Sequence, residues 1–126
     1  MEPVNLFDLA AQQSRWLAVR QAAIAGNVAN VNTPGYGAAE VEPFEKVLDS
    51  THVAIKATDP RHISTGIGGT NIAVRTEEND AVAMPSENSV VLETELMKAG
   101  EVRRMFELNT AIVKAFHRMT LMSVKT

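Results

Sequence analysis

The last third of the chain carries a long apolar repeat, and this repeat limits the possible folds more than any other feature. From about Val90 to Ser123 the sequence is typical of one continuous helix. Its apolar seam alternates at spacings of three and four through Val102, Met105, Asn109, Ile112, Phe116 and Met119. A helix of this span is on the order of 50 Å long at ~1.5 Å per residue, too long for the interior of a small globular domain. We therefore expect it to lie against a second long helix.

The N-terminal segment supplies that second helix, predicted from about Leu6 to Val31. One stripe repeats every seven positions through Ala10, Leu17, Ile24 and Val31, and Leu6 widens it; Gln13, Arg20 and Asn27 are its polar interruptions. A second stripe, on another side, holds only small residues: Ala11, Ala18, Ala22, Ala25 and Ala29. A helix with apolar or small residues on two sides has more surface to bury than one neighbour can cover.

The middle of the chain differs in character from its ends. Prolines and a glycine cluster punctuate it, and only His52 to Lys56 and Thr70 to Arg75 alternate weakly, as short strands or extended loops do. The predicted fold class is mainly α, with long N- and C-terminal helices that pair as an antiparallel coiled coil and an irregular or short-β insert between them. The corresponding segments are 1–36, 37–88 and 89–126.

Two details of the C-terminal helix can be predicted. Asn88 or Ser89 is expected to cap its start. Asn109 lies in the middle of the apolar seam, and two interpretations stay open: it sets the register between helices, or the seam rotates and Asn109 faces water.

Composition argues against several classes of function. The net charge of −3 does not match the basic surface of a nucleic-acid-binding protein, and the chain has no cysteine for disulfides or thiolate metal sites. His52, His62 and His117 lack the spacing of a zinc site, and no serine sits in a glycine-flanked nucleophile turn. We expect no catalytic, cofactor-binding or metal site, no small-molecule substrate and no enzyme activity. The N-terminus also lacks the pattern of a cleaved signal peptide.

The turn after the first helix holds the most specific motif. Pro34 fixes the start of the turn, Gly35 permits a positive φ, and Asn30, Asn32 and Thr33 can bond the last helical carbonyls and the amides that follow. Tyr36 is expected to anchor the outgoing strand on a neighbour. The motif residues are Asn27, Ala29, Asn30, Thr33, Pro34, Gly35 and Tyr36.

This pattern, Asn-x-Ala-Asn-x-x-Thr-Pro-Gly-Tyr, closely resembles the N-terminal motif of flagellar axial proteins, the rod, hook and hook-associated subunits. The short chain, the stretch from Thr58 to His62 and the segment from Asn88 to Leu108 resemble the proximal rod proteins in particular. Gly37 departs from the family, since many relatives carry Lys or Arg after the tyrosine.

The resemblance implies a structural role. Such subunits are exported unfolded through the flagellar type III apparatus without cleavage of a signal. They polymerise at the export gate on the periplasmic side of the inner membrane, next to the adaptor FliE, and the rod transmits torque. The implied partners are other copies of the chain and neighbouring rod subunits.

The two apolar seams are the expected subunit interface. The residues assigned to it are Leu6, Ala10, Leu17, Ile24, Val31, Val102, Met105, Asn109, Ile112, Phe116 and Met119. The alternative function is a stand-alone coiled-coil adaptor that dimerises. A dimer needs one apolar seam, whereas the first helix has two.

Overall fold

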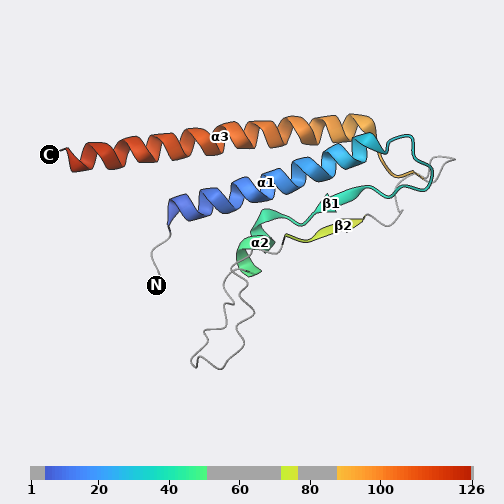
Figure 1. Cartoon of the computed structure of the whole chain (residues 1–126), viewed down its shortest axis with the longest axis horizontal. Helices are drawn as coiled ribbons and strands as arrows, with labels where there is room; N and C mark the ends of the chain where they lie inside the picture. The colour runs from blue at the N-terminus through green and yellow to red at the C-terminus, as the bar shows by residue number, and fades with distance from the viewer. Residues whose placement is uncertain (1–4, 51–71, 77–87, 126) are drawn as a thin grey trace, which may run out of the picture.

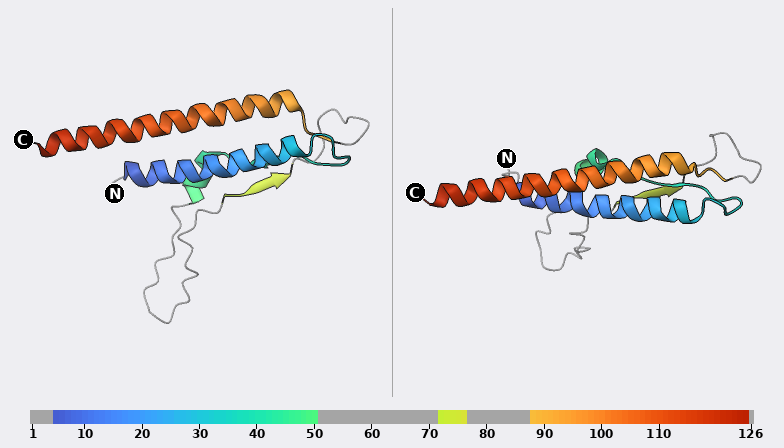
Figure 2. Two further views of the ribbon diagram at one scale, coloured as in Figure 1. Left: turned by 45° about the horizontal axis from the view of Figure 1, so that its top comes forward. Right: turned by 90° about the horizontal axis from the view of Figure 1, so that it is seen from above.

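Two long antiparallel helices form the frame of the molecule. The computed structural model describes residues 5–50, 72–76 and 88–125. Helix α1 spans Leu6–Ala29 and helix α3 spans Leu92–Val124, and they lie side by side in every view (Figures 1 and 2). Between them in sequence come β1 (Ala39–Val41), α2 (Phe44–Ser50) and β2 (Val74–Thr76). The predicted fold class, a mainly helical chain with a long helix at each end and a short-β insert, is confirmed.

Helix α1 has a well-defined start and stop. The side chain of Asn5 accepts a hydrogen bond from the Phe7 amide at 3.1 Å, and Asp8 in the first turn suits the positive end of the helix dipole. The helix ends at Ala29, two residues before the expected Val31, because the Asn30 amide closes the last turn onto Gly26 and Asn27.

The predicted cap of α3 is wrong. Val91 occupies the N-cap position and its side chain makes no capping bond. Asn88 and Ser89 lie too far upstream to cap α3. Ser89 Oγ instead accepts a hydrogen bond from the Ala38 amide at 2.8 Å, and the Asn88 side chain donates hydrogen bonds to the turn after α1. The start of α3 is therefore tied to the turn rather than capped by its own preceding side chains.

The insert contains more regular structure than its sequence suggested. Strands β1 and β2 pair antiparallel, with Glu40 opposite Arg75. Strand β2 overlaps the predicted stretch Thr70 to Arg75, whereas His52 to Lys56 lies outside the described residues. Helix α2 was not expected. Its first turn forms where the amides of Lys46 and Val47 donate hydrogen bonds to the Pro43 carbonyl.

All three parts contribute to one core. Trp16, Leu17 and Ile24 of α1 pack with Val102 of α3 and with Val41 and Val47 of the insert. Trp16 also donates its Nε1–H to the Glu42 carbonyl at 2.7 Å, and its ring lies tilted against Phe44 with 5.7 Å between the ring centroids. The insert thus covers a second side of α1, next to the side that α3 covers. Among the described helices, none combines the length and apolar character that crossing a bilayer would need.

Candidate assembly site

The motif residue Asn27 joins α1 to the other parts of the fold. Its side chain is fully buried. Its amide pairs with the backbone of Ala39 as a neighbouring strand would: Oδ1 accepts the Ala39 N–H at 2.8 Å, and Nδ2 donates to the Ala39 carbonyl at 2.9 Å. Nδ2 also donates to Glu95 Oε2 at 3.1 Å. One side chain therefore holds β1 and α3 against α1.

The carboxylate of Glu95 is buried beside Asn27 and has its charge compensated. Lys98 Nζ lies 3.4 Å from Glu95 Oε1 and also bonds Glu40 of β1. Burial alone would lower the pKa of Lys98, but the hydrogen bonds and charges of Glu40 and Glu95 outweigh burial and raise that pKa above its ordinary value. The cluster links α1, β1 and α3 through polar contacts. Because these contacts are directional, they fix the relative placement of the three elements more specifically than apolar packing does.

The turn after α1 has the predicted positive φ at Gly35 and the predicted bond from Asn30 to a helical carbonyl. Gly35 has a φ of 71°, in the left-handed region that favours glycine. Asn30 Nδ2 donates to the Gly26 carbonyl at 2.8 Å, and Thr33 Oγ1 donates to Asn30 Oδ1 at 3.1 Å. The hydroxyl of Tyr36 lies beside Gly26. Within the chain, Tyr36 thus packs back onto α1; the expected anchoring on a neighbour stays a prediction.

Asn88 has a structural role that the sequence pattern did not predict correctly. Its Nδ2 donates to the carbonyls of Asn30, Val31 and Thr33, each at 2.9 Å, and its Oδ1 accepts the Val90 amide at 2.8 Å. It therefore holds the motif turn against the start of α3. In a sequence, an asparagine just before a helix is typical of an N-cap. The carbonyls that accept hydrogen bonds from Asn88 lie more than fifty residues away, and no local sequence pattern predicts them.

Asn109 lies between the helices. Its side chain is 6% exposed, and Nδ2 donates to the Ala10 carbonyl at 3.1 Å and to Ser14 Oγ at 2.8 Å. The interpretation that Asn109 faces water is wrong. Its bonds match one specific position on α1, so a shift of α3 by a turn would leave a buried amide without partners.

The structure divides the expected interface residues into three groups. Ala10, Leu17, Ile24, Val102 and Asn109 are buried inside the chain itself. Leu6, Val31, Met105 and Phe116 are half-buried, and Phe116 meets Phe7 edge-on at 5.3 Å between ring centres. Ile112 and Met119 are exposed. The set as a subunit interface stays a prediction, and the exposed members are the ones open to a neighbour.

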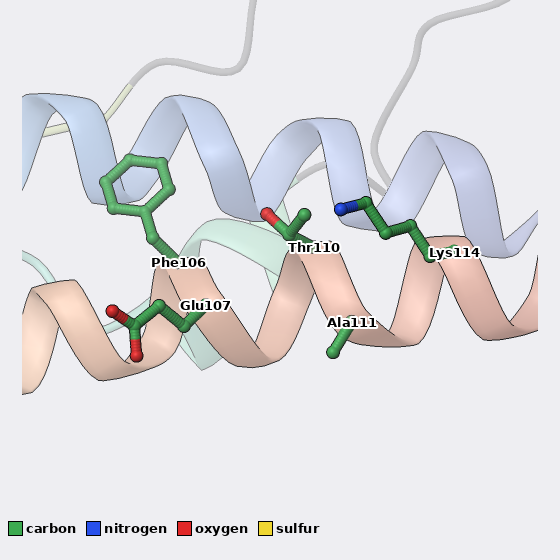
Figure 3. A pocket seen from close by; sticks show the side chains of 5 residues that line it. All are labelled: Phe106, Glu107, Thr110, Ala111 and Lys114. Atoms are coloured by element: carbon green, nitrogen blue, oxygen red, sulfur yellow. The ribbon is translucent and has the colours of Figure 1, made fainter.

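An open hollow of about 370 Å³ lies on the surface of α3. It is lined by Phe106, Glu107, Thr110, Ala111 and Lys114. Figure 3 shows Phe106 extending towards α1 while Ala111 points away from it. All five residues belong to one helix, and the hollow holds a single acid and a single base. Across residues 5–50, 72–76 and 88–125, no group of three acidic, histidine or cysteine side chains is placed to hold a metal ion.

Comparison with known proteins agrees with this arrangement. The family described as flagella basal body rod protein matches residues 9–36, which cover most of α1 and the whole turn. The chain is also 45% identical over 129 aligned residues to the flagellar basal body rod protein FlgB of Agrobacterium fabrum, across 99% of this chain and 96% of that relative. A likeness of this level over the full length extends to α3 and the insert as well as the motif. The chain therefore belongs to the family of flagellar basal-body rod proteins, structural subunits of the bacterial flagellum.

Proposed function

We propose that this chain is a subunit of the proximal part of the rod, where it polymerises with copies of itself and with neighbouring rod subunits into the shaft that transmits torque. The observation that carries this proposal is the full-length similarity to a protein named FlgB. The geometry agrees, since an antiparallel helix pair with apolar residues left on its outer faces suits a subunit that is completed by its neighbours.

The proposal includes a route and a place. The chain leaves the cytoplasm through the flagellar type III apparatus without cleavage, and it assembles on the periplasmic side of the inner membrane beside FliE and the export gate. This part rests on the resemblance of the N-terminal motif to the axial proteins. The exported chain folds when its two ends come together, because α1 and α3 lie at opposite ends of the sequence.

The alternative function, a stand-alone coiled-coil adaptor, fits the fold less well. In a two-stranded dimer, the apolar seam of each chain packs against the other chain. Here Leu17 and Val102 are already buried against each other's helices within a single chain. The seam that a dimer would use is therefore filled.

Fractionation of basal bodies tests the proposed function. The gene is deleted, the full chain is supplied from a plasmid, and purified basal bodies are probed with an antibody against the chain. We expect the deletion strain to lack rods and swimming, and the complemented strain to hold the full-length, uncleaved chain in its basal bodies. A chain that stays soluble as a dimer while basal bodies form normally would contradict the proposal and favour the adaptor.

A further inference from the structure

Helix α3 carries a second apolar seam that points away from α1. Leu108, Ile112, Ala115, Met119 and Met122 recur at spacings of four, three, four and three, and we call them the outer seam. Its four large side chains are between 44% and 60% exposed. This spacing is that of a coiled-coil heptad, so the outer seam has the pattern of a surface that packs along another helix.

Helix α1 carries a row of small side chains whose spacing resembles that of the outer seam. Ala11, Ala18, Ala22, Ala25 and Ala29 are all exposed, and we call them the alanine stripe. They are spaced at seven, four, three and four residues, so the stripe also follows a heptad. Small side chains let the axis of a second helix approach closely, and large side chains from that helix can then fill the space between.

The alanine stripe faces away from the insert. Successive residues of a helix are rotated by about 100°. Leu17 faces α3, and Trp16, one residue earlier, packs against α2 and β1. Ala18, one residue later, therefore points to the opposite side of the helix pair.

The outer seam lies on the insert side of the pair. Lys98 bonds Glu40 of β1, and Ile112 and Met119 follow Lys98 two and three heptads later along α3, so the drift of about 20° per heptad turns them further from α1 than Lys98. Glu101 pairs with Arg20, and Leu108, Ala115 and Met122 continue that second line at steps of seven. The outer seam thus prolongs the insert-facing side of α3 beyond the position of β1. The two surfaces consequently lie on opposite sides of one molecule.

We infer that the outer seam of one copy of this chain packs onto the alanine stripe of the next copy. This inference rests on the proposed function, because it names the contact by which the subunits would join. Large side chains facing small ones bury apolar surface on both helices, whereas two alanine stripes would bury little and two outer seams would hold the helices apart. Because the two surfaces differ and face opposite ways, the contact is head-to-tail and repeats from copy to copy, which generates a ring or a helical array.

Disulfide trapping tests the contact, and the absence of natural cysteine makes the background clean. Ala115→Cys is combined in one full-length chain with Ala11→Cys, Ala18→Cys, Ala22→Cys or Ala25→Cys. Each double variant is the sole copy in a strain without the natural gene. Basal bodies are isolated, oxidised, denatured and run without reductant.

A head-to-tail contact predicts a ladder of dimers, trimers and larger species for at least one double variant, while each single variant stays monomeric. Dimers from Ala115→Cys alone would mean that two outer seams meet, and would overturn the inference. Monomers from every double variant, in basal bodies that contain the chain, would also overturn it while leaving the proposed function intact. Absence of even the unmodified chain from basal bodies would overturn both.

A pair of neighbouring substitutions gives a second measure. Met119→Glu places a charge in the outer seam, and His117→Glu places the same charge on another exposed side of α3. We expect at least a tenfold loss of basal bodies containing the chain for Met119→Glu and less than a twofold loss for His117→Glu, with equal helix content in the two purified monomers by circular dichroism. Equal incorporation of the two variants would overturn the inference.

Discussion

Three asparagine side chains hold the parts of this molecule together at the residue scale. Asn27, Asn88 and Asn109 are all buried, and each bonds atoms of a segment distant in sequence. An amide offers a donor and an acceptor at fixed geometry, so it selects one arrangement of the segments it joins. Apolar side chains would supply burial without that selection.

Replacement of Asn27 by aspartate is expected to be strongly destabilising. Asn27→Asp keeps the shape but removes the donor that serves Ala39 and Glu95, and it places two carboxylates side by side. We expect the free energy of unfolding to fall by about 2–5 kcal/mol, measured by urea denaturation. Asn32→Asp, at an exposed position of the turn after α1, is the control and should change stability by less than about 0.5 kcal/mol. Equal losses in the two variants would contradict the role assigned to Asn27.

Gly35 allows a separate test of the turn. A Cβ at Gly35 would meet no atom within 4 Å, so any penalty comes from the φ of 71° and not from a clash. Gly35→Val should cost about 1–3 kcal/mol, and Gly35→Asn should cost less, because asparagine adopts the left-handed region more readily. We expect the valine variant to be exported but excluded from rods and the asparagine variant to swim. Normal swimming with valine would show that assembly does not depend on this turn.

At the scale of elements, the helix pair depends most on the middle of α1. Leu17 is fully buried among α1, α3 and the insert, whereas Phe116 is half-buried against Phe7 near the open end of the pair. The contact between α1 and the insert adds polar links through Trp16 and Asn27. Packing is therefore strongest where three elements meet and weaker where only two do.

This gradient predicts an order of destabilisation by truncation. Leu17→Ala should cost about 2–5 kcal/mol as a buried large-to-small change. Phe116→Ala should cost less than the 3–5 kcal/mol typical of a fully buried phenylalanine, because its ring is partly exposed. Glu107→Ala, exposed on α3, should cost about 0.5 kcal/mol or less. Urea unfolding of the three variants checks the order, and a larger loss for Glu107→Ala than for Leu17→Ala would refute it.

The link between β1 and α3 through Lys98 should depend on pH. The raised pKa of Lys98 means that the folded chain holds this proton more tightly than the unfolded chain. The resulting stabilisation is fully present below the ordinary pKa of 10.5 and is lost as pH rises through the higher folded value. In thermal unfolding, Lys98→Met should be less stable than wild type at about pH 9. The difference in stability between the two proteins should become smaller by about pH 11. A difference in stability that stays constant over this pH range would exclude a contribution from the Lys98 proton.

At the scale of the whole molecule, the two helices are unequal. Helix α1 has 24 residues and α3 has 33, and the C-terminal end of α3 extends past the start of α1 (Figures 1 and 2). The side chains from His117 to Val124 are exposed. A helix usually needs tertiary packing for stability in water, so we expect this end of α3 to depend on a neighbour for protection.

Hydrogen exchange should reveal that dependence. In the purified monomer, amides from His117 to Val124 should exchange much faster than those near Leu17 or Val102, because local opening costs least where few apolar contacts exist. In assembled rods the same amides should become protected. Equal protection of both regions in the monomer would contradict the proposed need for a neighbour.

The sequence by itself determined the two long helices and their pairing, because the periodicity that reveals them is local and runs for several turns. It also determined the positive φ of Gly35. The tertiary structure decided the partners of Asn27 and Asn88, since hydrogen bonds between distant segments leave no local pattern. It also decided which face of α3 turns inward near its C-terminal end. A strict seven-residue repeat points Ile112 and Met119 at α1, but a straight helix has about 3.6 residues per turn and drifts from that repeat. The half-buried position accordingly moves to Val113, and Ile112 is left on the outer surface.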